Sequence, residues 1–303
     1  EYQSICGEAS DDVINPLESY EEDYLIPQAV DEILSGGSYA LANQAKCPFK
    51  AFAEHRLKAQ STPQPTEGID PKERGQVIHK AMELLWTSLQ SQEQLLSLEP
   101  SALGCLIDES IHQAIAQLSA THPQFTQTVE IQRLKKLIHA CMDWERQRPP
   151  FKIAALEQSF SINLAGVDFK VRVDRLDSVD EKTWVIDYKS SLPSTKPWYE
   201  ERPKEPQLLL YALLDENINT LMHLQLKAGN VQVSGISEET TGVSGVSSIK
   251  KDDTWTSCIT RWQQQLWQLA EEYQKGICTP SPAATSICQF CEHQALCRLN
   301  FSL

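Results

Sequence analysis

The fold of this chain follows from residues 167–189, VDFKVRVDRLDSVDEKTWVIDYK. Apolar side chains occupy the odd positions of 167–173, and this alternation predicts a β-strand with one face on the core. Trp, Val and Ile, which favour strands, lead into Asp187 and predict a second strand over 184–189. We expect the two strands to be neighbours in one sheet.

Helical patterns lie on both sides of these strands. Asp70 at the N-cap, Pro71 at the first position and Glu73 at the third predict the start of a helix. Further helices are expected near 101–119, 126–148, 206–216 and 253–275, further strands at 160–164, 221–227 and 231–237, and a loop at 238–248. The sequence therefore predicts an α/β fold over residues 38–303, with a small mixed β-sheet flanked by helices.

Charge is distributed unevenly over the 303 residues, which carry 41 acidic and 27 basic side chains. Residues 1–45 hold ten acidic side chains and no Lys or Arg, which leaves 31 acidic and 27 basic residues in 46–303. We expect 1–37 to be an acidic linker or arm. Because the sequence starts at Glu1, we expect a processed chain or, in preference, a piece of a longer protein. No apolar run is long enough to span a membrane and no leader peptide opens the chain, so we expect a cytoplasmic protein.

The two strands carry carboxylates and a lysine suited to phosphate chemistry. We expect Asp174 at the end of the first strand, open to solvent, and Asp187 and Lys189 on one face of the second. Carboxylate oxygens are ligands for Mg²⁺, and an ammonium group stabilises charge on a phosphate. An Asp-x-Lys pair alone is more often a pair of surface charges, so the hypothesis depends on its neighbours.

Four further polar residues stand near these strands. His79 follows Gly75 by one helical turn, and Gly75 leaves room for a strand or ligand beside the imidazole. Glu157 is polar within an otherwise apolar strand, and Gln207 and Tyr211 share one helix face. Taken singly, His79 is more often structural and Glu157 a strand-edge residue.

Cysteine spacing indicates a metal centre. Cys288, Cys291 and Cys297 form a C-x2-C-x5-C motif, and Cys47 is the candidate fourth ligand. Spacing alone allows a structural Zn²⁺ as readily as an iron–sulfur cluster, and four free cysteines are the remaining alternative. The other five of the nine cysteines are expected to be small buried hydrophobes.

Seven motifs in this order resemble the RecB-type branch of the PD-(D/E)XK nucleases, and most closely AddB-like nuclease domains that carry an iron–sulfur cluster. The resemblance extends over about residues 38–298. The motifs are Cys47-Pro48-Phe49, Gly75-x-x-x-His79, the Glu157 strand, Val173-Asp174-Arg175-Leu176-Asp177, Ile186-Asp187-Tyr188-Lys189-Ser190, Gln207-x-x-x-Tyr211 and the closing cysteines. Val173 stands where the family name has proline.

The resemblance implies a restriction-endonuclease-like fold and a role for each matched residue. The residues that would bind Mg²⁺ or Mn²⁺ are His79, Glu157, Asp174 and Asp187. Lys189 would be the catalytic lysine, with Gln207 and Tyr211 supporting it beside the two aspartates. The ligands of a [4Fe-4S] cluster, which would tie the N-terminal and C-terminal segments together, would be Cys47, Cys288, Cys291 and Cys297.

The implied activity is that of a DNA exonuclease in repair or recombination, acting on single strands or duplex ends. The chain would then be the C-terminal domain of a larger AddB-like protein, working with a helicase subunit or an N-terminal helicase-like region. The phosphate-binding motif Gly-x4-Gly-Lys-[Ser/Thr] does not occur in the chain, so ATP-driven unwinding is not expected within it. The alternatives are a DNA-binding scaffold domain with little cleavage and a structural zinc module in a complex.

Overall fold

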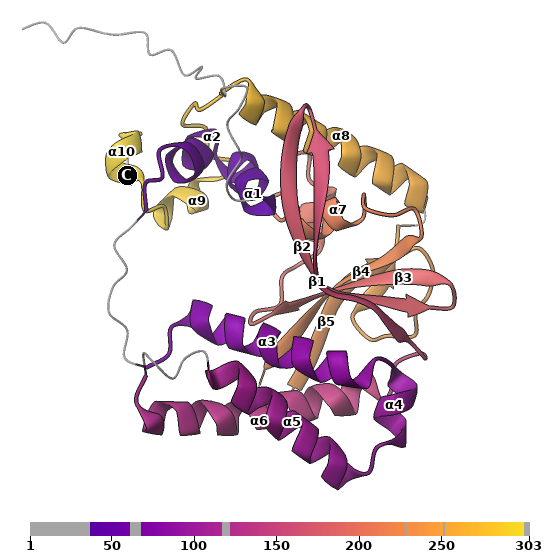
Figure 1. Ribbon diagram of the computed structural model, residues 1–303. Helices are drawn as coiled ribbons and strands as arrows, with labels where there is room; N and C mark the ends of the chain where they lie inside the picture. Colours follow the sequence, from indigo (N-terminus) through magenta and orange to yellow (C-terminus); the bar gives the residue numbers. More distant parts are fainter. Residues whose placement is uncertain (1–36, 61–67, 117–121, 228–229, 251, 300–303) are drawn as a thin grey trace, which may run out of the picture.

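A computed structural model describes residues 37–60, 68–116, 122–227, 230–250 and 252–299 (Figure 1). The expected acidic arm, apart from Gly37, lies outside these residues. The architecture is mixed α/β, with a six-stranded mixed sheet between layers of helices. This confirms the predicted mixed sheet flanked by helices.

Helices precede the sheet along the chain. They are α1 (Ser38–Lys46), α2 (Pro48–Ala51), the π-helix η1 (Phe52–Arg56), α3 (Pro71–Leu89), α4 (Gln92–Ser97), α5 (Pro100–Ile115) and α6 (Gln124–Glu145). The predicted start of α3 is confirmed, because Asp70 caps the helix and Glu73 closes the capping box. The capping fixes the first turns of α3, from which His79 projects.

The sheet has the strand order β1-β2-β3-β4-β5-β6. Its strands are β1 (Lys152–Leu164), β2 (Val167–Val179), β3 (Lys182–Lys189), β4 (Ile218–Lys227), β5 (Asn230–Ser237) and β6 (Val246–Ser248). The pairs β3–β4 and β5–β6 are parallel, and the other three pairs are antiparallel. The crossover from β3 to β4 carries the 3-10 helix η3 (Lys196–Tyr199) and α7 (Gln207–Tyr211).

Each face of the sheet is covered by its own set of helices (Figure 1). Helices α3 to α6 pack on the face that carries Ile186 and Leu224. Helices α1, α7 and α8 (Trp255–Gln274) pack on the face that carries Val185 and Leu221. The chain ends in α9 (Thr285–Gln289) and α10 (Gln294–Cys297), which lie beside α2.

The strand β2 changes its inward face at Asp174. Before it, apolar residues from Val167 to Val173 pack on the α8 side, whereas Val179 packs on the side of α3 to α6. The prediction that Asp174 ends its strand and is open to solvent is therefore wrong, since β2 continues to Val179 and Asp174 is 7 % exposed. The alternation stops where the strand changes face, and this is why the pattern suggested an end.

Other expectations are corrected in detail. The helix expected over 206–216 is the shorter α7, and the loop expected over 238–248 contains β6. Cys105 is exposed, contrary to expectation, whereas Cys141, Cys258 and Cys278 are buried as expected. Within the parts of the chain that the structure describes, none of the helices has both the length and the apolar character needed to cross a bilayer.

Candidate metal centre and active site

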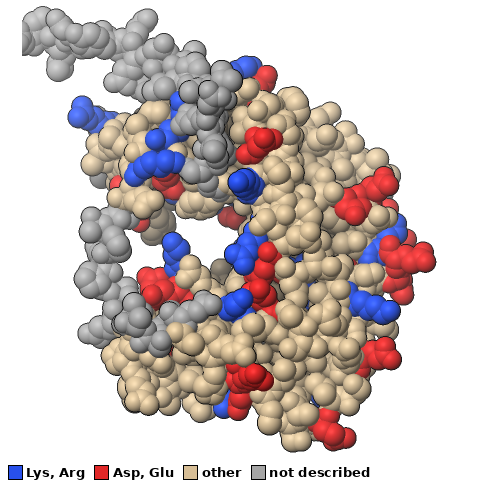
Figure 2. All heavy atoms as spheres, in the orientation of Figure 1, with Lys and Arg blue, Asp and Glu red and all other residues tan. Residues whose placement is uncertain are grey.

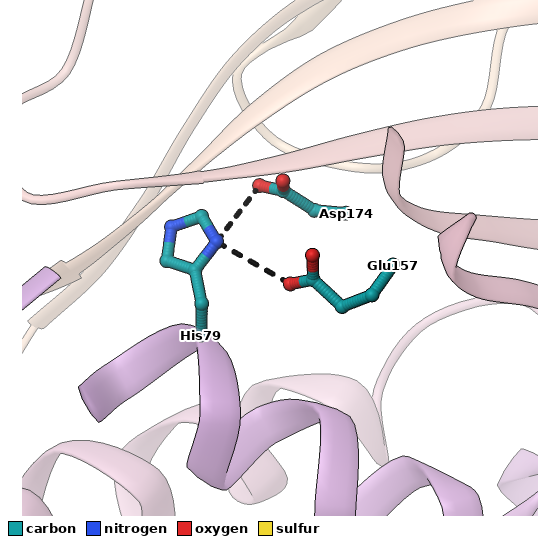
Figure 3. A group of neighbouring side chains, drawn as sticks. All are labelled: His79, Glu157 and Asp174. Atoms are coloured by element: carbon teal, nitrogen blue, oxygen red, sulfur yellow. Dashed lines mark ion pairs between the residues drawn. The ribbon is translucent and has the colours of Figure 1, made fainter. Parts of the chain in front are cut away.

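Three potential metal ligands meet between α3 and the first two strands (Figure 3). His79 Nδ1 lies 3.5 Å from Glu157 Oε1 and 3.5 Å from Asp174 Oδ2, and ligand atoms of all three residues lie within 4.8 Å of one another. The strand pairs on either side of them, Leu156 with Arg175 and Gln158 with Val173, bring Glu157 opposite Asp174. The bend that presents Glu157 has a left-handed backbone, with φ of 47°.

The hydrogen bonds of His79 leave Nδ1 facing the two carboxylates. Its Nε2 lies 3.2 Å from the backbone oxygen of Tyr188, which only accepts, so Nε2 carries the proton of a neutral ring. Once Nδ1 gives up its own proton, its lone pair faces Asp174 and Glu157, the arrangement that a metal-binding histidine adopts. Burial lowers the pKa of the imidazole, but the contacts with Asp174 and Glu157 outweigh it and raise the pKa of His79 to about 10.

The two aspartates have different partners. Asp174 Oδ2 accepts a hydrogen bond of 2.9 Å from the backbone N–H of Tyr188, and burial together with the charge of Asp187 raises its pKa. Asp187 is fully buried, and its Oδ2 contacts Lys189 Nζ at 2.8 Å and His223 Nδ1 at 3.1 Å. Burial acts to raise the pKa of Asp187, but the bond from His223 and the charge of Lys189 lower it overall.

Asp187 is not a member of the close group around His79, although its charge acts on both His79 and Asp174. Its Oδ1 is buried and has no hydrogen-bond partner among the described residues. Leaving a buried carboxylate oxygen unpaired is costly, so such an atom indicates a missing ligand. A hard divalent cation fits this donor set of one imidazole and three carboxylates.

Lys189 is held by a chain of hydrogen bonds. Its Nζ donates to Gln207 Oε1 at 2.9 Å, and Gln207 Nε2 lies 2.8 Å from the hydroxyl of Tyr211. The Tyr211 hydroxyl donates in turn to the backbone oxygen of Arg172. Burial strongly raises the pKa of Tyr211, so this hydroxyl stays protonated. The structure thus brings together Asp187, Lys189, Gln207 and Tyr211, as the sequence pattern suggested.

A cavity of about 660 Å³ opens on His79, Glu157 and Asp174, which we call the His79 group. Figure 2 shows the molecule hollowed between α3 and the β1–β2 hairpin, with basic and acidic side chains on the rim. A Cβ placed on Gly75 would meet no atom within 4 Å, so this glycine borders open space and not a packed strand. The residues lining the cavity include Lys72, Lys80 and Arg172 beside Glu157 and Asp174.

Sequence reasoning missed a buried ionic network next to the site. Arg175 contacts Glu145 at 2.7 Å and Asp177 at 2.6 Å, and Arg148 contacts the same two carboxylates at 2.7 and 2.8 Å. Arg175 Nη1 also donates to the hydroxyl of Tyr188 at 3.1 Å. These partners are up to 30 residues apart in the chain, and no local pattern relates them.

A second missed residue is His223, whose imidazole contacts Asp187. It lies within Leu-Met-His-Leu-Gln-Leu on β4, and the signal available was one basic ring inside a strand that is otherwise largely apolar. His223 is 3 % exposed and packs against the ring of Trp198 at a centroid distance of 5.5 Å.

The four cysteines of the predicted cluster line one cavity of about 480 Å³. Burial raises the pKa of the Cys288 thiol, and the sulfur atoms of the other three raise it further. No three of these sulfurs lie within 4.8 Å of one another, although all four belong to the described part of the chain. Nearby, His293 Nε2 lies 3.2 Å from Glu54 Oε1 and links the C-terminal segment to η1.

Comparison with known proteins agrees with this arrangement. The sequence matches the family model described as the PD-(D/E)XK nuclease superfamily over residues 39–298. No curated protein sequence matches the chain. A solved structure described as "Crystal structure of SSO0001" is 13 % identical and aligns over 87 % of this chain and 96 % of that one, but its TM-score of 0.30 is too low to bear on the fold. Because the family model covers most of its length, the chain belongs to the PD-(D/E)XK nuclease superfamily.

Proposed function

We propose that this chain is a divalent-metal-dependent deoxyribonuclease that hydrolyses phosphodiester bonds in DNA repair or recombination. Members of the superfamily are typically metal-dependent nucleases. We further propose exonuclease action on single strands or duplex ends, as the C-terminal domain of a larger AddB-like protein. A helicase subunit, or a helicase-like region of the same polypeptide, is its proposed partner.

One observation carries the proposal. The His79 group supplies nitrogen and oxygen donors, and Asp187, whose Oδ1 has no partner among the described residues, lies beside Lys189, which is held by Gln207. Structural ion pairs satisfy both carboxylate oxygens with protein donors, as the buried Asp177 does with two arginines. Asp187 instead keeps one oxygen for which the described residues provide no donor, which suits a metal ligand.

Each residue has a proposed role. His79, Glu157, Asp174 and Asp187 would hold Mg²⁺ or Mn²⁺. A bound ion would supply Lewis-acid stabilisation of the phosphate and lower the pKa of a coordinated water. Lys189 places its ammonium beside Asp187, where it stabilises negative charge that develops on the phosphate and orients the attacking water. Gln207 and Tyr211 fix the position of that ammonium.

The cavity supports a nucleic-acid substrate. Lys72, Lys80 and Arg172 line it next to the carboxylates, and basic side chains of this kind bind backbone phosphates. Arg172 Nε lies 2.6 Å from Glu157 Oε2, so this guanidinium also balances the charge of a proposed ligand.

Digestion of linear single-stranded DNA with Mg²⁺ or Mn²⁺ tests the proposal. The wild type should degrade the strand, and Lys189→Ala should lose about 100- to 1,000-fold in rate, as removal of one transition-state donor does elsewhere. The matched control is Lys182→Ala, which removes an exposed lysine from the same strand. Equal cleavage by wild type and Lys189→Ala would refute the role of Lys189. DNA binding by the wild type without cleavage under any divalent metal would favour a scaffold domain.

We also propose that Cys47, Cys288, Cys291 and Cys297 bind a [4Fe-4S] cluster. Structural Zn²⁺ bound by the same four cysteines is the alternative. The proposal is supported by the cavity of about 480 Å³ that all four cysteines line. Such a centre would tie α2 to the C-terminal segment and close a loop of more than two hundred residues.

Iron and acid-labile sulfide in anaerobically purified protein test the cluster. Cys291→Ser should lower both, together with the broad visible absorbance and the thermal stability, while Cys105→Ser should leave all four unchanged because Cys105 is exposed elsewhere on α5. Stoichiometric zinc without sulfide would replace the cluster by the alternative and leave the nuclease proposal intact.

A further inference from the structure

Strand β4 places two polar side chains beside the proposed catalytic pair. In the parallel register of β3 and β4, Asp187 pairs with His223 and Lys189 pairs with Gln225. Directly paired residues present their side chains on the same face of a sheet. β4 lies between β3 and β5, and both His223 and Gln225 are buried. Both polar residues therefore sit in the interior, next to Asp187 and Lys189.

The contact between His223 and Asp187 has a defined direction. His223 Nδ1 lies 3.1 Å from Asp187 Oδ2. An ionised carboxylate only accepts hydrogen bonds, so Nδ1 is the donor. The same Oδ2 also receives Lys189 Nζ at 2.8 Å, whereas Oδ1 has no partner among the residues that the structure describes. Because both donors bind Oδ2, they fix the rotation of the Asp187 carboxylate. Oδ1 then remains available to bind another ligand.

Packing alone does not explain a histidine at this position. His223 Nε2 is buried and makes no hydrogen bond within the described residues, although the ring packs against Trp198. Burying a polar atom without a partner is unfavourable, so an apolar side chain would stabilise the core better at this position. Within the described parts of the chain, the single hydrogen bond that the imidazole makes is the one to Asp187.

We propose that His223 is a positioning residue for the divalent metal: it holds Oδ2 of Asp187 so that Oδ1 stays available to the ion. The inference rests on the proposed function, in which Asp187 is a metal ligand. His223 does not itself touch the metal or the substrate; it acts through the orientation of the carboxylate, as partners of ligand side chains do in known metal sites.

Titration of Mg²⁺ and Mn²⁺ into three folded variants, followed by calorimetry without DNA, tests the proposal. His223→Leu removes the donor and should weaken metal binding about 10- to 100-fold, as loss of such a partner does elsewhere. His223→Asn keeps an N–H donor near the position of Nδ1 and should stay within a few-fold of wild type. The matched control is Thr220→Val, which removes a hydroxyl hydrogen-bonded to Ser237 from the same strand; it should cost stability without changing metal affinity.

Cleavage measurements give a second readout. In His223→Leu the metal concentration needed for half-maximal rate should rise, and most of the maximal rate should return at saturating metal. Should His223→Leu fail to fold, His223→Gln replaces it, because the longer side chain moves the amide donor away from Asp187.

Two results would overturn the proposal: wild-type metal affinity in His223→Leu, or equal weakening in His223→Asn and His223→Leu, which would assign the effect to packing. A wild type that binds no divalent ion would instead refute the proposed function, and this inference with it.

Discussion

Protons and metal ions should compete for His79. The imidazole lies between Asp174 and Glu157, and these contacts raise its pKa to about 10 in the metal-free protein. A metal ion can bind only the neutral ring, so binding must displace the proton from Nδ1. Metal affinity should therefore rise with pH, and the raised pKa sets the range over which it does.

The size of the effect follows from the pKa. At pH 7, three units below about 10, the protonated ring exceeds the neutral ring about a thousandfold, and the apparent affinity is reduced by the same factor. We expect the dissociation constant of Mg²⁺ to fall about tenfold for each pH unit from 7 to 9, with about one proton released per ion bound.

Calorimetric titrations with Mg²⁺ at pH 7, 8 and 9, in two buffers of different ionisation enthalpy, give both the affinity and the number of protons released. The control is His79→Asn, in which the competing proton is absent and the affinity should be nearly independent of pH over this range. A wild-type affinity that stays constant from pH 7 to 9, with no proton release, would refute the assignment of His79 as a ligand.

The raised pKa of His79 also predicts how the stability of the metal-free fold changes with pH. The pKa of His79 is higher in the folded state than the ordinary 6.5, so its contribution is complete below about 6.5 and is lost as the pH rises through about 10. In excess chelator, the melting temperature of the wild type should therefore fall between pH 8 and 10 by more than that of His79→Asn. Parallel curves for the two proteins would contradict the raised pKa.

Three further predictions concern the surroundings of the site. Asp177→Asn should cost about 3–5 kcal/mol of unfolding free energy in urea, because it leaves two buried arginines with the single carboxylate of Glu145. Gln207→Leu should lower the cleavage rate about 10- to 100-fold at unchanged Mg²⁺ affinity, since it frees Lys189 without touching a proposed metal ligand. Lys72→Ala should reduce the salt dependence of single-strand binding by about 0.7 in the log–log slope, measured by fluorescence anisotropy in Ca²⁺.

Local patterns in the sequence predicted most of the secondary structure near the site. The capping residues of α3, the alternation in β2 and the apolar run of β3 each reflect short-range rules, and the structure confirms all three elements. His79 and Glu157 carried weak signals individually. Only the order of the motifs indicated that His79 and Glu157 belong to the same site as the aspartates. The structure brings both residues next to Asp174.

The features that were missed depend on contacts between distant segments. Arg175 and Asp177 continue β2 as buried charges, so the strand has no apolar pattern after Val173. The register that places His223 beside Asp187 arises from the pairing of β3 with β4, which the two strand sequences do not specify. The spacing of apolar residues along the sequence shows only which side chains avoid water. It therefore cannot predict a charged side chain that is buried by partners from distant segments.

Tyr188 connects the proposed metal ligands to the buried ionic network around Arg175. This connection gives a reason for keeping buried charges that apolar side chains could replace without loss of stability. Its backbone N–H binds Asp174 and its backbone oxygen accepts from His79, while its hydroxyl accepts from Arg175. Buried ion pairs seldom stabilise a fold more than apolar residues of the same size. A network that holds Arg175 rigidly, however, fixes both ends of Tyr188 and with them the spacing of the ligands. Replacing Tyr188 by Phe, which keeps the backbone contacts and the ring but loses the hydroxyl, should therefore disturb metal affinity more than global stability.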